Sequence, residues 1–255
     1  MEIPLTKILT AVLAISVRVS GLMLFAPFFG SAVIPPRVKA ILVLAITVVL
    51  YPVTASQVSA VNMVRWPILI ATELAIGIAL GVAANLVFDA AQMAGQILSI
   101  QMGYSLINIL DPQTEVDTTV VALFHQTIAM AIFLRLDVHH WLLRAIANSY
   151  DYLPPGSIVL NGRFVMALLG IGARVFEVGL QIAAPVFSAT LLADVVLGLL
   201  GKSAPQMPLM LLGPALKSVL GLTILAAALV YWPDLFQQWF QKSIVYSDRI
   251  LHLAR

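Results

Sequence analysis

The sequence predicts an all-α, polytopic protein made of hydrophobic helical hairpins, and its composition is the main reason. Of the 255 residues, 61% are hydrophobic and only 10% are charged, and the mean hydropathy is +1.00. An ordinary soluble domain is about 45–50% apolar and about 25% charged. A soluble core of this size cannot hide so many apolar side chains, so we expect most of them to face lipid or other protein.

Charge and cysteine content exclude several classes of protein. The net charge of +2 arises from 14 basic and 12 acidic residues, a balance that indicates no nucleic-acid partner. Without cysteine, the chain has no disulfide framework and no thiolate metal site. The start of the chain is nearly neutral, and apolar character continues to Gly30 without a small-residue cleavage site. We therefore expect no cleavable signal peptide.

Apolar stretches recur along the first part of the chain. A hydrocarbon core about 30 Å thick needs roughly 20 helical residues. Residues 8–29 and 38–53 each meet this length approximately. Residues 66–110 are too long for one span, so we expect two helices or a bent hairpin there, with Gly95 and Gly103 as the weak points.

The second part of the chain repeats this pattern. Residues 164–200 are again too long for one span, and Pro185 predicts a kink or turn within them. The spacing of apolar residues after Pro233 is typical of an amphipathic helix. We expect one unit with four sections: N-terminal helices and a pore segment (1–110), a loop, helix and polar connection (111–163), C-terminal hairpins (164–232) and the amphipathic tail (233–255).

Charged residues inside the apolar stretches are candidates for function. A charge near the bilayer centre costs at least about 2.5–3.5 kcal/mol, so each should face protein, water or a partner. Arg174 and Glu177 are three residues apart on one helical face and can neutralise each other. Glu73, Asp89 and Asp194 have no local partner, which favours interface hydrogen bonds or exposure at a segment end and leaves a proton relay as the alternative. Arg18 and Lys217 are the other charged residues in these stretches.

Small residues are concentrated between residues 75 and 84. Gly77 and Gly81 form a GxxxG pattern, which lets two helix backbones approach closely. The surrounding alanines extend the small-residue surface to more than one side of the helix. We expect this helix to pack tightly, as a subunit of an assembly requires.

The sequence contains no convincing catalytic or metal-binding pattern. Asp137, His139 and His140, together with His125, could suggest a metal site, but adjacent histidines point in different directions on a helix. No His-Glu-x-x-His pattern, nucleophile elbow or phosphate-binding loop is present. We therefore expect no enzyme activity, no cofactor and no metal.

Polar residues interrupt the apolar stretch 94–112. Gln96, Gln101, Ser105 and Asn108 precede an Asp-Pro pair. This pattern suits a water-accessible or protein-lined interior better than lipid, where an irregular backbone would lack hydrogen bonds. Bulky flexible groups beside these residues could close a narrow passage. The alternative is an ordinary helix end followed by a loop.

Taken in order, many short motifs of this chain resemble the FliR/SctT/SpaR/YscT family of type III export-gate subunits. The chain departs from the family pattern at two places. Val138 stands where glycine is usual, and Gly201-Lys202 stands where an Asn-Arg or similar pair is common. The matching motifs are Arg18 with Ala26-Pro27, Ile34-Pro35-Pro36-Arg37, Glu73 with Ile76-Gly77-Ile78-Ala79-Leu80-Gly81, Gly95-Gln96, Gln101-Met102-Gly103-Tyr104-Ser105, Asp111-Pro112, Leu153-Pro154-Pro155-Gly156, Ala193-Asp194, Ala204-Pro205-Gln206, Gly213-Pro214 and Lys217.

The resemblance implies one subunit of a helical, membrane-associated export channel in the bacterial inner membrane and flagellar basal body. The subunit would join FliP and FliQ copies, with FlhB and FlhA below, and pass unfolded flagellar proteins. The resemblance also implies a pore plug at Met102, Gly103, Ser105, Leu106, Ile107, Asn108, Ile109, Leu110, Asp111 and Pro112. Helix or subunit interfaces are expected at Glu73, Gly77, Gly81, Gly95, Gln96, Gln101, Arg174, Glu177, Asp194, Pro205, Gln206 and Lys217.

Two other functions remain open at this stage. The Gln-Met-Gly and Ala-Pro-Gln forms favour the flagellar branch over an injectisome subunit of the SctT type. From a different class, the chain could be a small ion-coupled secondary transporter, with Glu73, Asp89 and Asp194 as coupling groups. Purification from the membrane would distinguish a transporter from an export-gate subunit. A transporter should purify as a monomer or homo-oligomer, whereas an export-gate subunit should co-purify with different small helical proteins.

Overall fold

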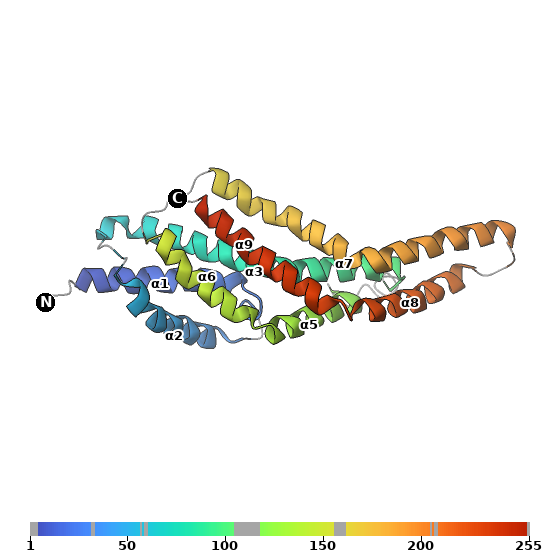
Figure 1. The fold of residues 1–255 in the computed structure, drawn as a ribbon, viewed down its shortest axis with the longest axis horizontal. Helices are drawn as coiled ribbons and strands as arrows, with labels where there is room; N and C mark the ends of the chain where they lie inside the picture. The colour runs from blue at the N-terminus through green and yellow to red at the C-terminus, as the bar shows by residue number, and fades with distance from the viewer. Residues whose placement is uncertain are drawn as a thin grey trace. The chain divides into compact units, whose positions relative to one another are not determined.

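The computed structural model describes residues 5–31, 34–56, 58, 61–104, 118–155, 162–204, 206 and 209–253, and this part of the chain forms helices and no strands. Figure 1 shows the helices in chain order. The prediction of an all-α fold is confirmed. The helices are α1 (Leu5–Phe25), α2 (Pro36–Thr54), α3 (Trp66–Gln101), α5 (Val120–Arg135), α6 (Val138–Tyr152), α7 (Gly162–Ser203), α8 (Leu209–Ala228) and α9 (Trp232–His252), with a 3-10 turn at Met63–Arg65.

Several of these helices can cross a membrane. In the described part of the chain, α1, α2, α3 and α7 are each long and apolar enough for one span. The bent pairs α5 with α6 and α8 with α9 each pass the same test together, so the total is four to six candidate spans. This pattern fits a multi-pass membrane protein, as the composition predicts.

The structure contradicts the predicted break at Gly95. Helix α3 runs for 36 residues without interruption and ends at Gln101. Gly95 does not weaken the helix, because it lies directly against the backbone of Ala122, where a side chain would not fit. The break occurs at the other predicted position, Gly103, whose φ of +86° is a conformation that favours glycine.

Of the kink or turn predicted at Pro185, the turn is not observed. Helix α7 continues through this proline for 42 residues. Apolar helices tolerate an internal proline when nearby side chains and small backbone adjustments satisfy the freed groups. The carbonyl that loses its helical donor here is that of Gln181, four residues before Pro185. The described part of each long apolar stretch is therefore one continuous helix up to its end at Gln101 or Ser203.

The chain forms two compact units, each built from separate stretches of sequence. The first unit contains Met1–Leu86, Phe133–Ala173 and Phe240–Arg255. It includes α1, which contacts α2, and α6, which also contacts α2. The second unit contains Val87–Ile132 and Arg174–Trp239. The site residues described below belong to one unit or the other.

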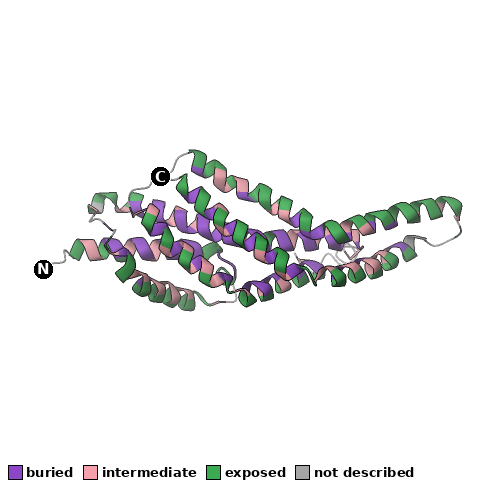
Figure 2. Cartoon of the chain, in the orientation of Figure 1, coloured by how far each residue is buried: buried purple, intermediate pink, exposed green. Residues whose placement is uncertain are grey.

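Burial differs strongly among the helices. In α1, residues such as Ile15, Val19 and Leu22 are almost completely buried. In α2, only Thr47 and Thr54 are buried, and Figure 2 shows exposed residues along much of α2 and α7. Helix α9 buries one face, which includes Phe236 and Phe240, and this confirms the amphipathic tail.

Candidate functional site

A fully buried arginine lies at the centre of the first unit. The Arg18 Nε donates a hydrogen bond of 2.7 Å to Glu73 Oε2. Its Nη1 donates to Ser149 Oγ at 2.8 Å, and its Nη2 donates to the Leu153 carbonyl at 3.0 Å. The guanidinium carbon also lies 3.9 Å from the centre of the Tyr150 ring. One side chain of α1 thus connects α3 with the C-terminal end of α6.

This network explains how two charges can be buried inside an apolar protein. Burying a charge costs several kcal/mol unless it is paired and hydrogen-bonded. Arg18 and Glu73 both have side chains with no exposed surface, and they form an ion pair. The Ser149 hydroxyl accepts from Arg18 and donates to the Ile146 carbonyl at 2.6 Å. Glu73, which has no partner close to it in the sequence, is thus paired with a residue of α1.

Glycines allow α1 and α3 to approach closely beside this pair. A Cβ atom added at Gly81 would lie 2.7 Å from the Leu22 carbonyl oxygen, and one at Gly21 would lie 2.8 Å from the Leu74 carbonyl oxygen. Gly77 faces the backbone of Arg18 and Leu22. The GxxxG surface of α3 is thus occupied by α1 of the same chain. The close backbone contact brings Arg18 within reach of Glu73.

A second polar cluster lies in the second unit. The Lys217 Nζ lies 2.9 Å from Asp194 Oδ1, and the Gln101 Nε2 donates to Asp194 Oδ2 at 2.8 Å. The Lys217 side chain is 17% exposed and that of Asp194 is 45% exposed, so the pair is only partly screened by solvent. Asp194, which has no partner close to it in the sequence, is thus paired with residues of two other helices. This cluster joins the end of α3 to α7 and α8.

The residues after α3 are fixed to α8. The Tyr104 hydroxyl is 2.6 Å from the Ser218 hydroxyl, and Met102 is buried beside Gly221. A Cβ atom at Gly103 would lie 3.1 Å from Pro214 Cβ. Met102 and Gly103 are the described members of the predicted plug. The other members lie outside the described residues: Ser105, Leu106, Ile107, Asn108, Ile109, Leu110, Asp111 and Pro112.

The remaining predicted interface residues are distributed over both units and do not form one site. Gly95 is buried against α5, and Gln96 is half-buried. Arg174 and Glu177 are both exposed on α7, as is Asp89 on α3. Gln206 is exposed, and Pro205 lies outside the described residues.

The structure corrects the expectation for the two adjacent histidines. His139 Nε2 and His140 Nδ1 lie 3.8 Å and 3.5 Å from the same oxygen, Oδ1 of Asp137. Their ring centres are 4.1 Å apart, so the rings do not point in different directions. His125 belongs to the second unit, where its Nδ1 lies 2.8 Å from the Val121 carbonyl oxygen.

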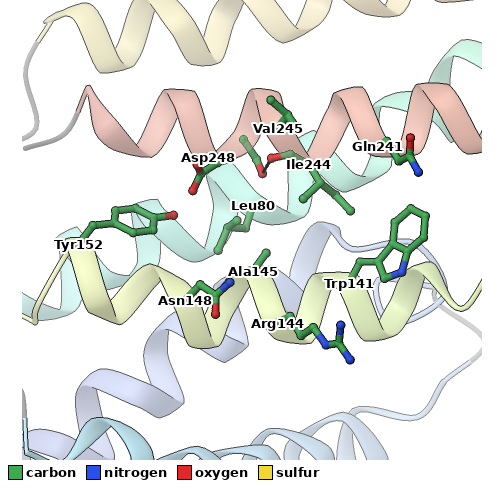
Figure 3. A pocket seen from close by; sticks show the side chains of 11 residues that line it. Leu80, Trp141, Arg144, Ala145, Asn148, Tyr152, Gln241, Ile244, Val245 and Asp248 are labelled. Carbon is green, nitrogen blue, oxygen red and sulfur yellow. Dashed lines mark hydrogen bonds between the residues drawn. The ribbon is translucent and has the colours of Figure 1, made fainter.

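A surface groove of about 440 Å³ lies between α6 and α9 in the first unit. Figure 3 shows Leu80 of α3 between the two helices, with Tyr152 and Trp141 at opposite ends. Exposed polar side chains such as Asn148 and Asp248 line its edges. Within the groove, Tyr152 forms a side-chain hydrogen bond with Asp248.

Sequence reasoning missed the hydrogen-bond partners of Arg18 and the contact of Tyr104 with Ser218. Ser149 and Tyr150 lie within residues 111–163, the section predicted to contain a polar connection. A signal was available for the ion pair, since a positive and a negative residue in two apolar segments can neutralise each other. No signal identified the Leu153 carbonyl, because every residue carries such an acceptor.

The amino-acid sequence of the chain is similar to those of known bacterial export proteins. The chain matches the family described as bacterial export proteins, family 1, over residues 9–243. It is 32% identical over 212 residues to the flagellar biosynthetic protein FliR of Escherichia coli (strain K12), which covers 82% of this chain and 80% of that protein. Over 226 residues it is 29% identical to FliR of Pectobacterium carotovorum subsp. carotovorum, covering 89% and 87%. For FliR of Bacillus subtilis (strain 168), identity is 27% over 210 residues, covering 81% of each chain.

Proposed function

Since the chain belongs to family 1 of the bacterial export proteins, we propose that it is a core subunit of the flagellar type III protein export gate. In this proposal it assembles with FliP and FliQ, contacts FlhB and FlhA, and forms part of a channel in the inner membrane at the flagellar basal body. Unfolded flagellar proteins are the substrates. The names of the relatives favour the flagellar system over an injectisome.

The uncovered apolar surface of the long helices is the observation that carries the assembly part of this proposal. Only 17% of the most apolar window of α2 and 22% of that of α7 is buried within the chain, against 50% for α1. Large apolar side chains such as Val48, Met166 and Leu192 are exposed on these helices. Either lipid or other subunits must cover them, and a helical channel built from several chains would do so.

The paired charges support this proposal over a secondary transporter. An ion-coupling carboxylate must bind and release its ion during each cycle. Glu73 is held by Arg18 in a fully buried pair, and Asp194 is held by Lys217 and Gln101. Both carboxylates therefore have structural partners in place of a free ion. Their positions suit a rigid scaffold better than a transport cycle.

The anchored end of α3 supports the proposed plug. Residues 102–112 would leave the helix at Gly103, and the side chains of Gln101, Met102 and Tyr104, on either side of this glycine, contact α7 and α8. A segment that starts from a fixed point can fill a passage in one state and be displaced by a substrate in another. The apolar residues 106–110 would then exclude water and ions from the closed channel.

The experiment that tests the proposed function is isolation with its neighbours. The chain is co-expressed with the small membrane proteins encoded beside it, purified through a tag on this chain, and weighed as an intact complex by native mass spectrometry. We expect one copy of this chain with several copies of at least two different helical proteins. A homogeneous monomer or homo-oligomer, purified while the neighbouring proteins are present in the membrane, would contradict the proposal.

A further inference from the structure

We propose that Asp137, His139 and His140 form a binding site for a divalent transition-metal ion such as Zn²⁺. The three residues lie at the start of α6, in the first unit. Each offers one ligand atom, and these atoms all lie within 4.8 Å of one another. The inference does not depend on the export function, since it rests on this cluster alone.

Two of the three distances between ligand atoms are close to those around a tetrahedral ion. Zn²⁺ binds nitrogen and carboxylate oxygen at about 2.0–2.2 Å, so two ligands of a tetrahedral site lie about 3.3–3.5 Å apart. Asp137 Oδ1 lies 3.5 Å from His140 Nδ1 and 3.8 Å from His139 Nε2. Movements of a few tenths of an ångström would bring these two pairs to coordination distance.

The backbone at Asp137 creates this arrangement. Asp137 precedes α6 with a φ of 54°, in the left-handed region that aspartate tolerates better than most residues. The His140 N–H donates to the Asp137 carbonyl oxygen at 2.9 Å, which closes the first turn over the aspartate. The aspartate side chain is therefore presented to both histidine rings.

The two histidines contribute in different ways. The His139 side chain is 29% exposed and its ring centre lies 6.2 Å from that of Phe133, so its position is restricted by packing. The side chains of His140 and Asp137 are 61% and 65% exposed. We infer that His139 is the preorganised ligand and that the more exposed Asp137 and His140 close around the ion.

The donor set indicates the class of ion. Two imidazole nitrogens with one carboxylate oxygen suit Zn²⁺, Co²⁺, Ni²⁺ or Cu²⁺, whereas Mg²⁺ and Ca²⁺ prefer oxygen ligands. Three protein ligands leave a fourth tetrahedral position for water or for another donor. The bound ion would link the residue before α6 to the first turn of that helix and stabilise the turn.

The site is tested with the full-length chain in detergent, purified through a tag that contains no histidine and freed of metal with a chelator. Zn²⁺ is titrated by calorimetry, and Co²⁺ is followed by its visible absorption, which is more intense in tetrahedral than in octahedral coordination. We expect one ion per chain. His139→Ala and His140→Ala should each weaken Zn²⁺ binding by at least about tenfold, since even outer-shell partners contribute about 10–100-fold.

A matched control is available in α9. His252 Nε2 lies 3.7 Å from Asp248 Oδ2, a histidine–aspartate pair of similar exposure without a third ligand. His252→Ala should leave Zn²⁺ affinity unchanged. The proposal is overturned if the parent chain binds no Zn²⁺, or if His252→Ala weakens binding as much as His140→Ala does.

Thermal unfolding provides a second measurement that separates lost ligands from lost folding. Zn²⁺ should raise the unfolding temperature of the parent chain and of His252→Ala, and it should not raise that of His140→Ala. With chelator present, His140→Ala and the parent should unfold at the same temperature, because His140 is an exposed side chain. An equal Zn²⁺-dependent rise in all three proteins would overturn the site.

Discussion

The side chains of Arg18 and Glu73 form a fully buried ion pair, with 2.7 Å between Nε and Oε2 and 55 residues between them in the sequence. This pair connects α1 to α3, and the same guanidinium continues to Ser149 and the Leu153 carbonyl. The close contact of the helix backbones at Gly77 and Gly81 sets the distance at which the pair forms. The packing of the first unit and its buried charges therefore depend on each other.

Removing one member of this pair should destabilise the chain strongly. Glu73→Leu leaves a buried guanidinium without its counter-charge, and Arg18→Met leaves a buried carboxylate. Each should lower the free energy of unfolding by about 3–5 kcal/mol. The double variant Arg18→Met with Glu73→Leu buries no charge and should lose less than either single variant. Thermal unfolding of the purified chain or complex measures this order, and a double variant less stable than both singles would contradict it.

Filling the close contact between α1 and α3 should reduce stability and assembly. A side chain at Gly81 meets the Leu22 carbonyl oxygen and Phe25, so Gly81→Leu forces the helices apart. We expect a lower unfolding temperature and a lower yield of the hetero-complex. Gly172→Leu is the matched control for the unfolding temperature of the isolated chain, because within this chain a Cβ atom at Gly172 meets nothing within 4 Å. Unchanged recovery of the complex from Gly81→Leu would show that the close contact is not required.

The Asp194–Lys217 pair distinguishes a structural role from ion coupling. Asp194→Asn removes the counter-charge of a lysine that is 17% exposed, and it should lower stability and export. The double variant Asp194→Asn with Lys217→Met removes both charges and should recover much of the lost stability and much of the lost export. Secretion of flagellar proteins and thermal unfolding are measured together. If the double variant is stable but remains as inactive as the single variant, the carboxylate has a role beyond pairing.

Shortening the proposed plug should open the closed channel. Deletion of residues 106–110 removes the apolar groups that exclude water and ions, while the anchored end of α3 remains. We expect an assembled but leaky gate, and a weaker leak when Ile107 and Ile109 are replaced with serine. Permeability to ions and small molecules is measured in cells that express the complete gate, with complex recovery as the assembly control. An assembled deletion variant as tight as the parent would contradict the plug.

The backbone conformation at Gly103 should matter for the same reason. An L residue at a φ of +86° is strained by roughly 1–2 kcal/mol, and its Cβ atom would press against Pro214. Gly103→Ala should therefore displace the segment that follows α3 and increase leakage less than the deletion does. Gly198→Ala serves as the control, since a Cβ atom there meets nothing within 4 Å. Equal permeability of the two variants in assembled gates would argue against a positioning role for Gly103.

Composition and segment length predicted the helical fold and its membrane character, because these depend on averages over many residues. The break at Gly103 was also predictable, since glycine permits the backbone to leave the helix there. The break expected at Gly95 and the turn considered at Pro185 do not occur, because the effect of either residue on a helix depends on the groups that pack beside it. A glycine against Ala122 is a packing surface, and a proline in a long apolar helix can be accommodated.

The family of the chain was predictable from ordered motifs, and the comparison over residues 9–243 confirms it. The partners of Glu73 and Asp194 were not predicted, because each lies in a distant segment and the sequence contains several candidates of opposite charge. The arrangement of His139 and His140 was misread for a local reason. Neighbouring side chains leave a helix in different directions, but here the two ring centres lie 4.1 Å apart and both rings lie near the Asp137 carboxylate.

Protein secretion by the bacterium that encodes this chain tests its proposed function most directly. The gene is deleted, and flagellar rod, hook and filament proteins are measured inside the cells and in the medium. We expect these proteins to be made but absent outside the cell, and expression of the parent chain from a plasmid should restore their secretion. Undiminished secretion of flagellar proteins by the deletion strain, with the deletion verified, would contradict the proposal that this chain is a core subunit of the flagellar export gate.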